Sequence, residues 1–186
     1  MNPISLAERL SYTLRRRGDV VAALRGALEC SRGWILDFGG GDGRVATALA
    51  PSLGAALVVA DVDAKALARA PRAVHPVRIH PRGALPFRPG SFDALFLVDV
   101  LHHIDNGPAR LADLARLLRP GGRLLVVDFD ARRRVTALFR LLARLGGFAC
   151  RHYAPDEVAN ALREAGLAAQ HRSIDWLRYL VAGRRE

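Results

Sequence analysis

The residues best suited to binding a ligand follow a short apolar run early in the chain. Residues 34–38 read Trp-Ile-Leu-Asp-Phe, a run typical of a buried strand, and it carries one acid, Asp37. A glycine-rich stretch comes directly after it, and a helical pattern starts at residue 45. Glycines in such a turn let the backbone bend sharply and let a ligand approach the main chain without meeting a Cβ atom. The glycines concerned are Gly39, Gly40, Gly41 and Gly43.

The spacing of these glycines separates two classes of ligand. A dinucleotide site has the pattern GxGxxG, in which the third glycine lets the helix pack closely on the strand. Counted from Gly39 and Gly41, that third position is Arg44, which is bulky and charged. The remaining length also leaves no room for a separate dehydrogenase catalytic domain. The observed pattern, GxGxG with an acid two residues before it, therefore favours another class of ligand.

The elements around this loop alternate between apolar runs and helical patterns. The apolar runs that we interpret as strands cover residues 34–38, 56–60, 77–80, 92–98 and 124–129. The helical patterns cover residues 45–53, 64–70, 109–118 and 156–165. Near-continuous apolar strands separated by helices are typical of a parallel sheet covered on both faces. The last two runs, 168–174 and 176–182, predict an antiparallel hairpin at one edge. The sequence thus predicts an α/β fold with a seven-stranded, mostly parallel sheet.

The chain has the length and composition of one globular domain. It has 186 residues, 51% hydrophobic and 25% charged, so we expect a single domain over 1–186. No apolar stretch is long enough to cross a membrane, and residues 1–17 lack the pattern of a signal peptide. The cysteines, Cys30 and Cys150, form no CxxC pair, so neither a disulfide scaffold nor a cysteine-based zinc site is expected. These features together predict a cytoplasmic protein.

The chain is strongly basic, and its charge is unevenly distributed. The formal net charge is +10, and all 28 basic residues except Lys65 are arginines. Residues 131–151 hold six arginines and no acid, and they predict an amphipathic helix inserted over 131–152. Such a helix could cap the site with its basic face in solvent, or lie on anionic lipid. Its apolar stripe consists of Val135, Leu138, Phe139, Leu142 and Leu145, with Arg133, Arg140 and Arg144 mostly on the other side.

Six motifs, in order along residues 30–182, resemble those of the class I S-adenosylmethionine-dependent methyltransferases. The glycine loop is similar to motif I of that family. The others are the strand ending in Asp61, LPF with GSFD at 85–93, VLHH at 100–103, LRPGGRL at 118–124, and YAPDE with LREAGL at 153–167. The similarity is greatest to the small-molecule, type 11-like branch around quinone and phospholipid methyltransferases. It implies a Rossmann-like, doubly wound sheet and methyl transfer from S-adenosyl-L-methionine.

The resemblance also implies which residues hold this cofactor and its product, S-adenosyl-L-homocysteine. Asp37 and the four glycines would hold the methionine end, and Asp61 with Val62 would hold the ribose. The residues implied for the adenine are Gly83, Ala84 and Leu85. The family usually has an acid in the loop after the third strand for the adenine amino group, and residues 79–84 contain none. A methyltransferase-like protein that binds without catalysing is therefore one alternative.

The methyl acceptor is expected at the ends of the fourth and fifth strands, which face the methyl group in this family. Asp99 ends the fourth strand and is predicted to bind the acceptor or the cofactor's amino group. His103 is the candidate general base, because a neutral histidine can accept a proton near pH 7. Asp128 and Asp130, together with Asp99, are similar to the metal-binding acids of catechol-type O-methyltransferases. Phe129 stands where that pattern has an asparagine, so no metal is expected.

The expected acceptor is a small or lipid-like molecule. An RNA methyltransferase is a second alternative, but residues 99–102 read DVLH rather than the Asp-Pro-Pro-aromatic run of enzymes acting on bases. With 6% aromatic residues the chain also shows no aromatic-interleaved basic platform, so nucleic acid is not favoured. Residues 1–30 are expected to be helical, as two short helices interrupted at Gly18 and Asp19. This N-terminal segment would form a lid across the cofactor or pack on the sheet.

Overall fold

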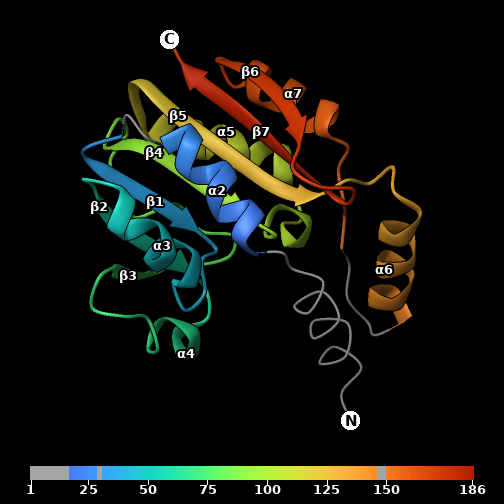
Figure 1. Cartoon of the computed structure of the whole chain (residues 1–186), viewed down its shortest axis with the longest axis horizontal. Coiled ribbons are helices and arrows are strands. Elements are labelled where there is room, and N and C mark those ends of the chain that lie inside the picture. The colour runs from blue at the N-terminus through green and yellow to red at the C-terminus, as the bar shows by residue number, and fades with distance from the viewer. Residues whose placement is uncertain (1–16, 29–30, 146–149) are drawn as a thin grey trace.

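The computed structural model describes residues 17–28, 31–145 and 150–186 (Figure 1). Its strands are β1 (Trp34–Phe38), β2 (Ala56–Asp61), β3 (His75–Arg78), β4 (Phe92–Val98), β5 (Leu118–Phe129), β6 (Leu167–Ser173) and β7 (Arg178–Arg185). Its α-helices are α2 (Arg17–Leu28), α3 (Arg44–Leu49), α4 (Ala64–Leu67), α5 (Gly107–Leu117), α6 (Arg134–Leu145) and α7 (Pro155–Glu164). Two short 3-10 turns are η1 (Ala50–Ser52) and η2 (Leu101–His103).

The strands form one seven-stranded sheet in the order β3-β2-β1-β4-β5-β7-β6. Strands β1 to β5 are mutually parallel, and β7 runs antiparallel to both β5 and β6. The predicted Rossmann-like, mostly parallel sheet with an antiparallel C-terminal hairpin is therefore confirmed. The direction of winding reverses between β1 and β4, and in open α/β sheets such a switch point is where ligands bind.

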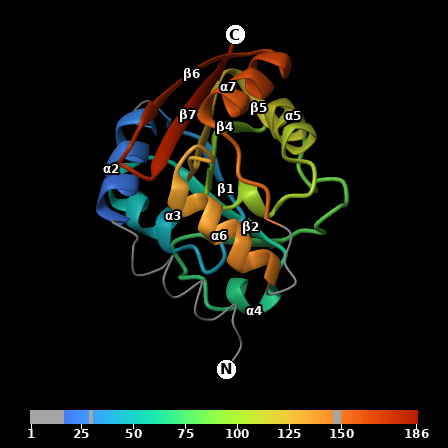
Figure 2. The same ribbon diagram turned by 90° about the vertical axis from the view of Figure 1, so that its right-hand side faces the viewer.

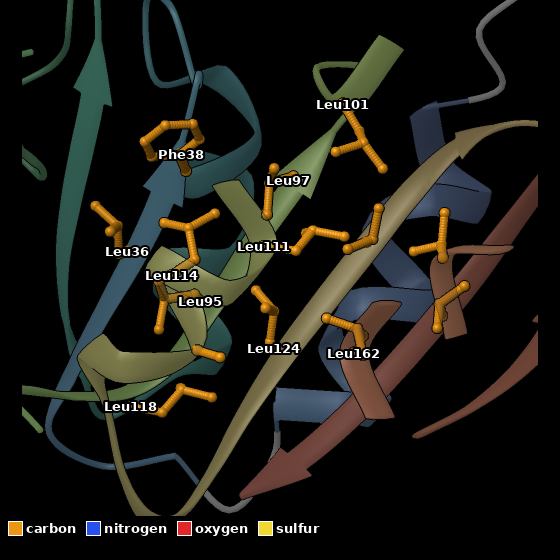
Figure 3. Packing of buried hydrophobic residues seen from close by; sticks show 14 of the residues in the cluster. Leu36, Phe38, Leu95, Leu97, Leu101, Leu111, Leu114, Leu118, Leu124 and Leu162 are labelled. Atoms are coloured by element: carbon orange, nitrogen blue, oxygen red, sulfur yellow. The ribbon is translucent and has the colours of Figure 1, made fainter. Parts of the chain in front are cut away.

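Successive residues of each parallel strand point to opposite faces, so the sheet has a core on each side. On one face Leu36, Leu95 and Leu124 pack against α5 and α7 (Figure 3). On the other face the neighbouring residues Ile35, Phe96 and Leu125 belong to a second cluster, to which α2 and α3 contribute. Burial on both faces explains why the strands are apolar along nearly their whole length.

Several element boundaries differ from the sequence-based expectation. The helix expected over 45–53 ends at Leu49 and continues as η1, because Pro51 cannot supply the backbone N–H that an α-helix needs there. Strand β5 begins at Leu118 rather than at residue 124, and its pairing with β4 shifts register between Phe92 and Ala94. The predicted break at Gly18 and Asp19 is wrong, since α2 runs through both residues. The rest of the predicted N-terminal helices, residues 1–16 and 29–30, lies outside the described residues.

Helix α6 stands at the periphery of the molecule (Figures 1 and 2). It lies within residues 131–152, the predicted insertion, of which residues 146–149 are outside the described part. In the ranges that the structure describes, no helix is both long and apolar enough to cross a membrane.

Candidate active site

A cavity of about 1280 Å³ lies at the carboxyl ends of the parallel strands, beside the switch point. Sites for single small molecules usually measure about 300–1,000 Å³, so this cavity has room for a cofactor and an acceptor together. The predicted site residues that line it are Asp37, Gly39, Gly40, Gly41, Asp61, Val62, Asp99 and His103. The predicted residues that are not part of its lining are Gly43, Gly83, Ala84 and Leu85.

The glycine loop adopts a conformation that requires glycine at alternate positions. The φ angles of Gly39, Gly41 and Gly43 are 74°, 58° and 72°, in the left-handed region that other residues rarely adopt. A Cβ atom on Gly39 would lie 2.5 Å from Cγ1 of Val100, which is too close. A Cβ atom on Gly41 would have only Oδ2 of Asp61 nearby, at 4.0 Å. The main chain at Gly41 therefore borders open space within the cavity, a cradle that a side chain would fill.

Asp61 connects the end of β2 to this loop. Its Oδ2 atom accepts a hydrogen bond from the N–H of Gly41 at 2.8 Å, and its Oδ1 atom accepts one from Asp63 at 2.9 Å. A carboxylate has about four acceptor positions, so two remain for the hydroxyls of a ribose. Asp63 in turn caps α4 by accepting hydrogen bonds from Lys65 and Ala66, as its position in the sequence suggested. The carboxylate of Asp61 is thus fixed in place before any ligand arrives.

Asp37 is the most deeply buried acid of the cavity wall, with 2% of its surface exposed. The pKa of its carboxyl group is raised to about 8, mainly by burial. A hydrogen bond from the backbone of Ala46 lowers this pKa, and the negative charge of Asp61 raises it. No described residue provides a hydrogen-bond partner for its Oδ2 atom. A ligand that brings a hydrogen-bond donor or a positive charge would satisfy this oxygen.

On the side of the cavity next to β3, the lining residues differ from the predicted Gly83, Ala84 and Leu85. The loop residues that line it are Ile79, His80, Pro81 and Arg82. The loop is held by Arg110 of α5, which donates hydrogen bonds to the carbonyl oxygens of Pro81 at 2.9 Å and Gly83 at 3.3 Å. An acid does line this side: Asp105, which follows η2 and pairs with Arg82 at 2.8 Å. Asp105 was not predicted because it follows β4 and η2 in the sequence and not the third strand.

The acceptor side of the cavity contains both residues predicted for it. Asp99 follows β4, is buried, and has a φ angle of 55°, the only positive φ among the described residues other than glycine. Its N–H donates a hydrogen bond to the carbonyl oxygen of Val127 at 2.9 Å, which fixes the turn to β5. The Nδ1 atom of His103 lies 3.6 Å from Sγ of Cys150. Burial raises the pKa of the Cys150 thiol, with the negative charge of Asp128 adding to the effect, so the thiol is neutral at physiological pH.

A buried pair of side chains lies directly behind His103. The Nδ1 atom of His102 is 2.6 Å from Oδ1 of Asp128, whose other oxygen accepts the backbone N–H of His102 at 3.1 Å. The rings of His102 and His152 are stacked, with centroids 4.7 Å apart. Burial alone would raise the pKa of Asp128, but the charge and hydrogen bond of His102 lower it below its usual range. Burial, helped by the charge of His102, lowers the pKa of His152 to about 4.

Asp130, the next acid along the chain, is also engaged. It pairs with Arg132 at 3.0 Å and with Arg133 at 3.8 Å. These contacts, chiefly with Arg132, outweigh burial and lower the pKa of Asp130. Within residues 17–28, 31–145 and 150–186, no three histidines, cysteines or acids are arranged to hold a metal ion.

Two further contributions to the cavity wall come from outside the strand ends and loops that the sequence motifs single out. Val20 and Val21 of α2 line the cavity, so the helix before the first strand forms part of the site. Arg178, at the start of β7, lines it as well and is almost completely buried. Its guanidinium donates to Oδ2 of Asp175 at 2.8 and 3.0 Å. Nothing in the local sequence marks Arg178, because only the antiparallel course of β7 brings it to this end of the sheet.

Comparisons with known proteins agree with this arrangement. A S-adenosylmethionine-dependent methyltransferase from Aquifex aeolicus superimposes with a TM-score of 0.76 over all of both chains, at 16% identity, which shows the shared fold. The demethylmenaquinone methyltransferase of Tropheryma whipplei is 37% identical over 109 residues, which cover 56% of this chain and 45% of the relative. The ubiquinone/menaquinone biosynthesis C-methyltransferase UbiE of Geobacter sulfurreducens is 28% identical over 72% of this chain and 62% of its own length. The chain thus spans about half to two thirds of these curated relatives.

The strand order and the glycine loop beside Asp61 agree with the resemblance of the sequence motifs to class I S-adenosylmethionine-dependent methyltransferases. Residues 36–126, just under half of the chain, match the family model described as a methyltransferase domain.

Proposed function

We propose that the chain binds S-adenosylmethionine in this cavity and transfers its methyl group to a small, lipid-like acceptor. The observation that carries the proposal is the hydrogen bond between Asp61 and Gly41 at the mouth of the glycine loop. It places an acid with spare acceptor positions next to main chain that no side chain covers. The matched methyltransferase domain includes both residues.

The residues present fit the ribose and the methionine end of this cofactor. Asp61 would hold the two ribose hydroxyls, with Val62 beside the sugar. Asp37 would face the methionine end, whose positive charges favour ionisation of a carboxyl group held neutral by burial. The open main chain at Gly41 would border the same part, and Gly40 packs against the carboxyl group of Asp37. Gly43 would act by shaping the loop, and Gly83, Ala84 and Leu85 remain predicted neighbours of the adenine.

The rest of the cavity suits an apolar acceptor. Its wall includes five aliphatic side chains, those of Val20, Val21, Val98, Val100 and Ile104. A wall of this kind favours an acceptor with apolar surface, because burying that surface is favourable in water. The relatives are named as methyltransferases of menaquinone and ubiquinone biosynthesis. We therefore infer a quinol-like acceptor with a lipid tail or another apolar substituent.

The protein's own residues have two tasks in such a reaction. When bound, S-adenosylmethionine supplies an electrophilic methyl group on a sulfonium ion. His103 would take the proton that the acceptor loses as its nucleophilic atom bonds to the methyl carbon. Asp99 would orient the acceptor by accepting a hydrogen bond from its hydroxyl group. Holding both reactants in one cavity would supply part of the rate enhancement.

Calorimetric titration with S-adenosylmethionine and S-adenosylhomocysteine tests the cofactor part of the proposal. Both should bind with a 1:1 stoichiometry. The proposal is refuted if neither S-adenosylmethionine nor S-adenosylhomocysteine binds.

Turnover is tested with a short-chain demethylmenaquinone analogue, reduced to its quinol, by mass spectrometry of the methylated product. His103→Asn should lower kcat by about a hundredfold or more while cofactor affinity is unchanged. His75→Asn is the matched control, because His75 lies on the edge strand β3 and outside the cavity. Cofactor binding without methylation of any apolar acceptor would favour the non-catalytic alternative.

A further inference from the structure

Helix α6 has two distinct sides, and they divide between them the apolar stripe predicted from the sequence. One side packs on the body of the protein through Thr136, which is buried, and through Val135 and Phe139, which are partly buried. A second side presents leucines to solvent, and this includes part of the predicted stripe. The exposed fractions of Leu138, Leu141 and Leu142 are 51%, 54% and 46%. These three are half of the six large hydrophobic residues that are exposed among the described residues.

The third feature of α6 is its positive charge. Residues 131–142 include four arginines and no acid. Arg132 and Arg133 pair with Asp130, so much of their charge is neutralised within the protein. Arg134 and Arg140 are exposed and form no salt bridge with any residue in the described ranges. The leucine side is therefore accompanied by basic groups and by no acid of the same helix.

An exposed tryptophan lies at the same end of the molecule. The N–H of Asp130, just before α6, donates to the carbonyl oxygen of Leu177 at 2.9 Å, which brings the β6–β7 turn close to the start of the helix. Trp176 in that turn is 62% exposed. Tryptophan is enriched at the boundary between lipid and water, where its ring can be partly buried while its N–H stays hydrated.

Helix α6 is also connected to the active site. The Phe139 ring makes an edge-to-face contact with Phe129 at 6.0 Å, and Phe129 lies 5.7 Å from the ring of His102. Because α6 follows the carboxyl end of β5, it lies at the end of the sheet where the cavity is found (Figure 1). A surface that binds α6 would thus lie near the cavity.

We propose that α6 and the neighbouring Trp176 bind an anionic membrane surface, with Leu138, Leu141 and Leu142 entering the headgroup boundary and Arg134 and Arg140 contacting acidic lipid. Exposed leucines beside arginines, without an acid, match the chemistry of an interfacial helix. A second copy of the chain would need acidic groups opposite these arginines. The proposal is independent of the proposed reaction, because it rests on the surface of α6 and not on the cavity.

Co-sedimentation with phosphatidylcholine vesicles, with and without phosphatidylglycerol, tests this proposal. The full chain should bind only the vesicles that contain phosphatidylglycerol, and added salt should weaken the binding. The double variant Arg134→Gln, Arg140→Gln should bind about fivefold more weakly for each arginine removed. The triple variant Leu138→Gln, Leu141→Gln, Leu142→Gln should lose binding although its net charge is unchanged.

Matched controls separate this surface from the overall basic charge. Arg72→Gln with Arg88→Gln lowers the net charge by the same amount at exposed positions outside α6, and should leave binding within about twofold. Trp34→Gln removes an exposed aromatic residue at the amino end of β1 and should have no effect. All variants should keep the thermal midpoint and S-adenosylmethionine affinity of the parent chain. The proposal is overturned if the parent chain does not bind vesicles that contain phosphatidylglycerol. It is also overturned if the control pair Arg72→Gln, Arg88→Gln weakens vesicle binding as much as the pair in α6 does. The same holds if the leucine variant dissociates a dimer and leaves vesicle binding unchanged.

Discussion

The Nδ1 atom of His102 lies 2.6 Å from Oδ1 of Asp128, and both side chains are buried. Strands β4 and β5 are parallel neighbours, with Val98 opposite Val127. His102, shortly after Val98, and Asp128, directly after Val127, therefore lie at the same end of the sheet. The carboxylate fixes the ring of His102, so that Nδ1 carries a proton and donates it in the hydrogen bond. The ring of His102 in turn contacts the rings of both His103 and His152.

Replacing Asp128 with asparagine should destabilise the fold at neutral pH by about 3 kcal/mol, because it leaves buried polar groups without their ionic partner. Urea unfolding at pH 7 measures this. Asp113→Asn, which breaks an exposed pair with Arg116, should cost less than about 1 kcal/mol. The pKa of Asp128 is lowered in the folded protein, so its stabilisation is lost as the pH falls through that folded pKa. A difference that persists unchanged in acid would contradict this assignment.

Replacing Asp61 with alanine should weaken S-adenosylmethionine binding by about 2 kcal/mol, or roughly thirtyfold, through loss of a charged acceptor. It also removes the hydrogen-bond partner of the Gly41 N–H. Asp61→Asn keeps one acceptor oxygen, so its affinity should lie between those of the parent chain and Asp61→Ala. Calorimetric titration measures all three. Equal affinity for all of them would mean that this acid does not face the ribose.

Two glycine substitutions separate the cost of folding from the cost of binding. Gly41→Ala and Gly90→Ala both place a Cβ atom on a residue with positive φ, 58° and 69°, so each should cost about 1–2 kcal/mol of stability. A Cβ atom at Gly90 meets nothing within 4 Å, and Gly90 lies outside the cavity. Only Gly41→Ala should abolish cofactor binding. Thermal unfolding and calorimetry on the same samples provide both readouts, and comparable affinities would refute the cradle at Gly41.

Asp37 should make the protein less stable as the pH rises. The pKa of its carboxyl group is about 8 in the folded protein and about 3.9 when unfolded, so between these values the folded state holds an extra proton. The contribution of Asp37 to the free energy of unfolding then falls by up to about 1.4 kcal/mol per pH unit in this window. Asp37→Asn lacks this contribution. Urea unfolding from pH 5 to pH 8 should show the stability of the parent chain falling relative to the variant, and parallel profiles would contradict the raised pKa.

The sheet could be predicted because short stretches of sequence are enough to identify its strands. Apolar runs such as 92–98, together with the glycines and prolines between them, are sufficient to place most strands and helices. The glycine loop and Asp61 are predictable for the same reason, since the loop directly follows β1 and Asp61 is the last residue of β2. The His102–Asp128 pair required the register of β4 and β5, which no local pattern contains. Periodicity likewise indicated that α6 is amphipathic, but only the contact of Phe139 with Phe129 shows which side faces the protein.

The left-handed backbone at Asp99 limits which amino acids can replace it when directed evolution is used to change the acceptor. Aspartate and asparagine tolerate this conformation better than most residues, and glycine adopts it freely. A saturation library at position 99 would therefore contain few variants free of strain, and β-branched replacements would be the most impaired. Engineers who wish to alter acceptor range should diversify Val20, Val21 or Ile104 instead, where the side chain changes without a backbone penalty of this kind.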